Sequence, residues 1–215
     1  MNSINKLTEL FSKFPGIGPR QAKRFVYFLL TRNSAYLEEF ARLLLKLNKE
    51  VSTCESCMRF FANSLHNTKV CDICGNPNRN TEMLMIVERD ADFENIEKSK
   101  IYDGKFFILG GKVPILEKNP EQRIRVSELK ERVQDKNLKE IILALSVSPD
   151  GENTEKYIRE LLSSIAEKPA LTRVSSSTRD GNKIKISILG RGLSTGIELE
   201  YPDSETLKNA FKNRA

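Results

Sequence analysis

The chain has 215 residues, of which 39% are hydrophobic and 30% are charged, and its formal net charge is +6. No apolar run is long enough to span a membrane, and the opening MNSINKLTEL lacks the apolar core of a signal peptide. These properties exclude an integral membrane protein. They predict a cytoplasmic protein with enough core for one large domain or two small ones.

The positive charge is concentrated at the N-terminus. Residues 1–32 contain six cationic side chains and one anionic side chain, a net charge of +5. About one unit of positive charge is left for the rest of the chain. Such clustering favours a polyanionic partner, of which nucleic acid is the most common.

Two short helices are predicted in this basic region. Before Pro15, which must end the first helix, apolar residues recur at the spacing of one buried face: Leu7, Leu10, Phe11 and Phe14. The second helix is expected from about Arg20 to Thr31. Its inward residues are expected to be Ala22, Phe25, Val26 and Leu29. Its outward stripe then consists of Arg20, Lys23, Arg24 and Tyr27.

A glycine hairpin joins the two helices. Gly16 and Gly18 let the backbone turn sharply and approach a ligand, and the first amides of the second helix carry a partial positive charge suited to phosphate. The pattern resembles a helix-hairpin-helix DNA-binding motif, which contacts backbone phosphates and reads no base edges. An ordinary Gly-Pro turn between two core helices with solvated charges remains the alternative.

A third helix is predicted from about Ser34 to Leu47, with Ser34 as its N-cap. Its buried face is expected to contain Leu37, Phe40, Ala41 and Leu44.

Two C-x2-C hooks follow, Cys54 with Cys57 and Cys71 with Cys74, and the chain has no other cysteine. Four thiolates at this spacing predict a tetrahedral Zn2+ site, closed and therefore structural. Redox chemistry and disulfides are the alternatives.

Beyond a turn-rich boundary at 76–80, short apolar runs alternate with amphipathic segments. Buried strands are predicted at 83–87, 106–109 and 141–145, and helices at 91–98, 124–133 and 153–166. This alternation indicates a mainly parallel sheet, whose ligands would bind beyond the carboxyl ends of the strands. Glu88, Gly110-Gly111 and the loop 148–152 follow those ends. Lys112 does not belong to a P-loop, because Phe106 and Val113 occupy positions that the motif reserves for Gly and Ser or Thr.

In this order and spacing, the parts resemble the RecR family of bacterial recombination mediator proteins. The resemblance rests on the hairpin Phe14–Arg24, the four cysteines, a Toprim-like sheet beginning Ile86-Val87-Glu88, Leu109-Gly110-Gly111 and the closing 196–201. It implies a multidomain α+β protein. The expected parts are a helix-hairpin-helix region (1–53), a four-cysteine zinc finger (54–80), a Toprim-like α/β domain (81–200) and a C-terminal segment (201–215).

The resemblance also implies a function and its residues. DNA would be contacted by the segment with Gly16, Gly18, Arg20, Lys23 and Arg24, and the two arginines would meet phosphates. The acidic residues Glu88, Asp92 and Glu152 would serve partner binding. The protein would be no enzyme but a ring-like homo-oligomer, a tetramer, that acts with RecO and RecF to help load RecA on gapped DNA.

Two features depart from the expected pattern. Toprim enzymes hold Mg2+ with an Asp-x-Asp after the third strand, where this chain has Ser146-Val147-Ser148. Residues 169–183 look inserted, and the alternating segment 183–188 predicts a half-exposed strand that would belong to an extended hairpin. Two rival functions stay open: a Mg2+-dependent Toprim enzyme with Glu88 as acid or base, and a zinc-stabilised adaptor that never touches DNA.

Overall fold

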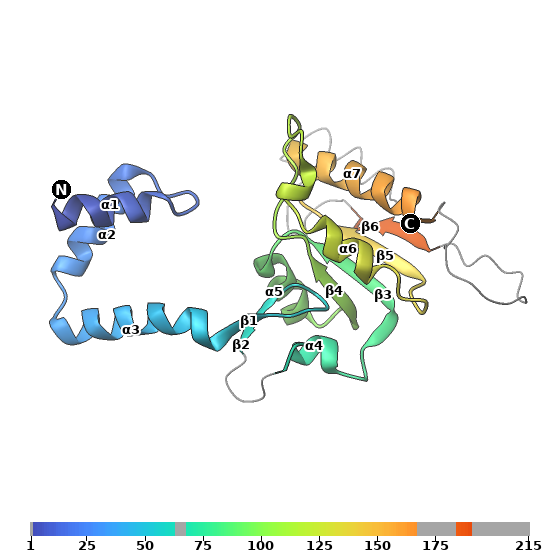
Figure 1. Cartoon of the computed structure of the whole chain (residues 1–215), viewed down its shortest axis with the longest axis horizontal. Helices are drawn as coiled ribbons and strands as arrows, with labels where there is room; N and C mark the ends of the chain where they lie inside the picture. The colour runs from blue at the N-terminus through green and yellow to red at the C-terminus, as the bar shows by residue number, and fades with distance from the viewer. Residues whose placement is uncertain (1, 63–67, 167–183, 191–215) are drawn as a thin grey trace, which may run out of the picture. The chain divides into compact units, whose positions relative to one another are not determined.

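The computed structural model describes residues 2–62, 68–166 and 184–190 (Figure 1). The predicted insertion at 169–183 and the closing segment 196–201 lie outside these residues. The chain divides into two compact units, Met1–Ser52 with Ala62–His66 and Thr53–Phe61 with Asn67–Ala215.

The first unit is helical. It contains α1 (Ser3–Ser12), α2 (Pro19–Leu30) and α3 (Ser34–Glu50). The rings of Phe11 and Phe25 meet edge to face with their centroids 5.8 Å apart, and Ala22 and Val26 of α2 are buried. The two faces predicted for the second helix are therefore confirmed: its apolar residues face α1, and its cations face outward.

The buried face predicted for the third helix is wrong. Leu37 and Phe40 are each 36% exposed, and Leu44 is 51% exposed. On the first helix, Leu7 and Leu10 are exposed in the same way. Helical periodicity shows that a helix is amphipathic but does not show what covers its apolar side.

The predicted caps of these helices also need correction. The N-cap of α3 is Asn33, whose side chain accepts a hydrogen bond from the Tyr36 amide at 2.9 Å, so Ser34 is the first helical residue. Helix α1 ends at Ser12, before Phe14 and Pro15. Phe14 therefore lies in the hairpin and is exposed.

The second unit is built on a parallel sheet. A small two-stranded sheet of β1 (Val51–Thr53) and β2 (Phe60–Ala62) and the short α4 (Asp72–Gly75) come before it in the chain. The large sheet has the order β4-β3-β5-β6. Its strands are β3 (Asn80–Val87), β4 (Gly104–Ile108), β5 (Glu140–Ala144) and β6 (Lys185–Ile188). Its helical segments are α5 (Asp90–Ser99), the 3-10 helix η1 (Pro120–Gln122), α6 (Val126–Arg132) and α7 (Pro149–Ala166).

All pairings in this sheet are parallel, as the sequence predicts. Ile86 of β3 lies between Phe107 of β4 and Leu143 of β5. The alternating segment near 183–188 does form a strand, and β6 adds to β5 in parallel, with Ile186 beside Ile141. The residues that would complete the predicted hairpin, 169–183, lie outside the part of the chain that the structure describes.

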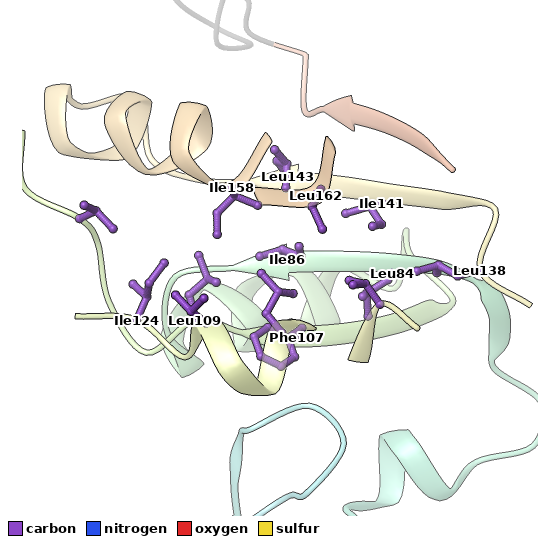
Figure 2. Packing of buried hydrophobic residues seen from close by; sticks show 14 residues of the cluster. Leu84, Ile86, Phe107, Leu109, Ile124, Leu138, Ile141, Leu143, Ile158 and Leu162 are labelled. Atoms are coloured by element: carbon purple, nitrogen blue, oxygen red, sulfur yellow. The ribbon is translucent and has the colours of Figure 1, made fainter. Parts of the chain in front are cut away.

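Side chains of the central strands point alternately into two cores. Leu84 and Ile86 belong to the core that α6 and α7 cover, where Figure 2 shows Ile158 and Leu162 of α7 beside Ile141 and Leu143. The next residues along β3 and β4 point to the opposite face: Met85, Val87, Phe106 and Ile108. There they pack against Phe93 of α5 and the four cysteines, of which only Cys74 is partly buried. The cysteine module is thus part of a core of the sheet domain.

Helix α7 begins earlier than predicted. The sequence places 148–152 in a loop and starts the helix at 153, whereas α7 starts at Pro149. Ser148 Oγ accepts a hydrogen bond from the Gly151 amide at 3.1 Å, which caps the first turn. Proline is favoured at the first helical position, so Ser148-Pro149 is the start signal. Glu152 therefore lies in the first turn of a helix.

Candidate metal centre and nucleic-acid interface

The four cysteines come together as predicted. Their sulfur atoms all lie within 4.8 Å of one another, and Cys54, Cys57 and Cys71 are buried. The Sγ atoms of Cys57 and Cys71 are 3.7 Å apart. Thiolates bound at about 2.3 Å to one tetrahedral ion would be separated by about 3.8 Å, so the donor set fits Zn2+. Among the described residues this is the one group of three or more candidate ligands that could hold a metal ion.

The thiols perturb one another strongly. The pKa of the Cys54 thiol lies well below its ordinary value, because Cys57 first, and then Cys71 and Cys74, can donate hydrogen bonds to its sulfur. The same bond to Cys54 raises the pKa of Cys57. Four sulfur atoms that share fewer than four protons carry negative charge. Such a cluster is suited to exchange its remaining protons for a metal ion.

A buried lysine fixes the second cysteine hook to the sheet. Lys105 of β4 is only 6% exposed, and its ammonium donates to the backbone oxygens of Ile73, Cys74 and Asn76 at 3.0, 3.1 and 2.9 Å. These carbonyls lie at the end of α4, where a cation is favoured. Lys105 therefore satisfies three backbone acceptors. It also places a positive charge beside the four cysteines, whose thiolates would together carry more negative charge than a divalent ion neutralises.

The first hook is held by different groups. The Ile108 amide donates to the Cys57 oxygen at 2.9 Å, so this hook pairs with the outer edge of β4. Arg125 reaches across from the start of α6 and donates to the oxygens of Met58 and Ile108 at 2.7 and 3.0 Å. Both hooks are thereby attached to one edge strand. No local pattern in the sequence indicates the roles of Lys105 and Arg125, because their acceptors are backbone oxygens 17 to 67 residues away in the chain.

The glycine hairpin has the geometry that the sequence predicts. Gly16 has a φ of +75°, a conformation that favours glycine, and Gly18 is the N-cap of α2. Arg20, Lys23 and Arg24 are exposed on the first turns of α2. Among the described residues, no carboxylate forms a salt bridge with any of these three cations. An exposed cationic stripe beside a helix N-terminus and a close-approach glycine turn can accept a phosphate backbone.

Only some of the residues predicted at the carboxyl ends of the strands lie close together. The Leu109 and Gly110 amides donate to the oxygens of Val87 and Glu88, so the ends of β3 and β4 are joined as expected. Glu88 is buried and accepts a hydrogen bond from the Ser146 amide at 2.6 Å. The other two predicted acids have different surroundings. Asp92 accepts from the Arg89 amide and caps α5, and Glu152 is exposed on α7.

Comparison with known proteins identifies both units. Residues 4–47 match the family model described as "RecR, helix-hairpin-helix", and residues 82–175 match the Toprim domain. The chain is 32% identical to the recombination protein RecR of Bacteroides thetaiotaomicron over 98% of its length and 92% of the relative's. It is 33% identical to recombination protein RecR of Legionella pneumophila, over 100% and 97% of the two chains, and 31% identical to that of Lactobacillus acidophilus, over 98% and 96%. None of the helices in the described part of the chain is long and apolar enough to cross a membrane.

Proposed function

Because the chain belongs to the RecR family of recombination proteins, we propose that it is a DNA-binding recombination mediator without catalytic activity of its own. In this role it acts in the cytoplasm with RecO and RecF and helps to load RecA on gapped DNA. The observation that carries the proposal is the exposed cationic stripe of α2 beside the glycine hairpin.

The hairpin supports contact with phosphates rather than bases. Arg20 and Arg24 lie one helical turn apart, and Lys23 lies between them in the sequence, so the three cations can follow a sugar-phosphate backbone. Such contacts position a protein on DNA and carry no sequence information. Affinity should therefore depend steeply on salt and little on base sequence.

We expect Arg20→Ala and Arg24→Ala each to weaken binding almost equally for all DNA sequences. Each change removes about one phosphate contact, so the slope of log affinity against log salt should fall by about one unit. Fluorescence anisotropy with two labelled oligonucleotides of unrelated sequence, titrated at several salt concentrations, measures both quantities.

Arg42→Ala is the matched control, because Arg42 is an exposed arginine of α3 whose guanidinium lies 3.9 Å from Glu39. It should leave the salt slope unchanged. Loss of binding to one oligonucleotide alone would indicate base readout. Unchanged affinity in both hairpin variants would remove the hairpin from the DNA interface and favour an adaptor that does not touch DNA.

The metal centre is proposed to hold Zn2+ as a structural ion. Four protein thiolates leave no coordination position for a substrate, and three of the cysteines are continuous with a core of the sheet domain. The metal then stabilises the fold and takes no part in chemistry.

Self-association is supported by the apolar surface of the helical unit. Tyr36, Phe40, Leu43 and Leu47 recur every three or four residues along α3, and all are more than one-third exposed. A stripe with this spacing is suited to packing against another helix. We propose that a second copy of the chain covers it, and that repeated contacts of this kind build the ring-like tetramer.

Leu43→Asp combined with Leu47→Asp should dissociate this contact, because two carboxylates would be buried in an apolar seam. Light scattering should then report a smaller assembly than the wild-type protein forms, whereas Arg42→Asp on the same helix should keep the wild-type mass. A wild-type protein that is a monomer at all concentrations would contradict the proposal, as would an unchanged mass in the double variant.

The Toprim-like domain is proposed to dock a partner rather than to catalyse. Exposed Glu152 would contact the partner directly, whereas buried Glu88 and the helix cap Asp92 would shape the docking surface from beneath. Catalysis by Toprim enzymes needs carboxylates dense enough to hold Mg2+ against its hydration shell. Here Ser146 and Ser148 stand at the two aspartate positions, and Asp92 caps a helix. Reproducible Mg2+-dependent cleavage, religation or primer synthesis by the pure protein, lost in Glu88→Ala, would restore the enzyme hypothesis.

A further inference from the structure

A lysine occupies the centre of the strand-end site. The Nζ atom of Lys112 lies 3.9 Å from Glu88 Oε2, and it also approaches the hydroxyl oxygens of Ser146 and Ser148 at 3.3 and 3.4 Å. By the sequence resemblance to Toprim domains, these three side chains correspond to the acid or base and the two metal-binding aspartates of a Toprim enzyme. The ammonium is thus surrounded by the groups that would otherwise face a divalent cation.

The donor set itself does not suit Mg2+. Serine hydroxyls are neutral and Glu88 is one carboxylate, whereas Mg2+ gives up water reluctantly and is bound through carboxylates or phosphates. The single negative charge of Glu88 is buried and needs a partner. An ammonium supplies one positive charge and hydrogen bonds in the same place, so the charges in the site balance without a metal ion.

The backbone around Lys112 is held firmly. The Val113 amide donates to the buried hydroxyl of Thr154 at 2.8 Å, and the Asn153 side-chain amide donates to the Val113 oxygen at 3.0 Å. The position of Lys112 is therefore fixed by α7.

The two serines are fixed from the same helix. Ser148 caps α7 through the Gly151 amide, and a Cβ atom on Gly151 would overlap the backbone oxygen of Ser146. The hydroxyl oxygens of the two serines are 3.0 Å apart. The N-terminal turn of α7 therefore preorganises both the hydroxyls of Ser146 and Ser148 and the ammonium of Lys112.

We propose that Lys112 is a resident cation that replaces the divalent metal of this Toprim-type site. The site then keeps its shape at any concentration of Mg2+, and a metal ion is excluded by the positive charge already present. The proposal concerns this site alone and does not rest on the DNA-binding role of the hairpin.

The test is to rebuild the metal site with and without Lys112. Ser146→Asp combined with Ser148→Asp restores the two carboxylates, and addition of Lys112→Met removes the competing ammonium. Binding of Mn2+ to each zinc-loaded protein is measured by the electron paramagnetic resonance signal of free Mn2+. The variant without Lys112 should bind Mn2+ about ten-fold or more tightly than the variant that retains it, because a like charge about 4 Å away is removed. Equal affinities would overturn the proposal, as would stoichiometric Mn2+ binding at this site in the wild-type protein.

If the aspartate variants do not fold, measurements of melting temperature test the proposal. Lys112→Met should lower the melting temperature by about 4 °C or more, since it leaves the buried Glu88 without its cation. Lys118→Met, an exposed lysine in the same loop, should change it little. In a Glu88→Gln background the effect of Lys112→Met should shrink by about half or more, since the charge to be balanced is gone. The same loss in both backgrounds would show that Lys112 acts by packing alone and would overturn the proposal.

Discussion

Cys57→Ser should abolish stoichiometric metal binding and lower the free energy of unfolding of the sheet domain by more than about 4 kcal/mol. Cys57 is 1% exposed and lies in the same core as Met85, Phe106 and Ile108. The variant therefore loses a metal ligand and leaves a polar hydroxyl among apolar side chains. Metal content by mass spectrometry and denaturant unfolding followed by circular dichroism measure the two effects.

Ser56→Ala is the matched control, because Ser56 lies beside Cys57 in the same hook but supplies no candidate ligand. It should keep the metal and stay within about 0.5 kcal/mol of wild type. Protein purified without chelator that contains no zinc, with all four thiols freely reactive, would contradict the assignment of a structural metal centre.

Lys105→Met should destabilise the sheet domain by about 3 kcal/mol. Methionine can fill most of the volume of the lysine stem, but it cannot donate to the oxygens of Ile73, Cys74 and Asn76, which would be left without the bonds they now receive from the ammonium. The change should also speed zinc release to a chelator, because the charge beside the thiolates is lost. Denaturant unfolding and the absorbance of a zinc-sensitive dye follow both effects.

Lys98→Met provides the comparison, because Lys98 is exposed on α5. It should change neither stability nor zinc release measurably. If Lys105→Met behaved in the same way, the three bonds from the ammonium would contribute nothing to holding the second hook, and the structural role assigned to Lys105 would be wrong.

Local sequence patterns were sufficient to predict much of this fold. The runs 83–87, 106–109 and 141–145 are apolar on both faces because helices and the cysteine module cover the sheet from both sides, and such runs are typical of parallel strands. The cysteine spacing predicted the metal centre because the hooks hold their ligands locally. The faces of α2 were predictable because a short helix packed on one neighbour shows its periodicity directly.

Other features depend on contacts that sequence spacing does not encode. The apolar side of α3 was expected to be buried, yet nothing in the periodicity specifies which surface covers it, and Leu44 is half exposed. Lys112 and Ser146 are 34 residues apart, and only the parallel order of β3, β4 and β5 brings them together. Lys105 lies 29 to 32 residues from the backbone oxygens that it contacts, and no local pattern in the sequence indicates this role.

The most direct test of the mediator role is RecA loading on gapped DNA covered by single-strand-binding protein. The rate of RecA filament formation is followed by its DNA-dependent ATP hydrolysis, with RecO present and with or without this protein. The mediator role predicts faster loading with the wild-type protein and loss of that stimulation in Arg20→Ala combined with Arg24→Ala. No stimulation by the folded, zinc-loaded wild-type protein, together with Mg2+-dependent turnover of the DNA itself, would contradict it.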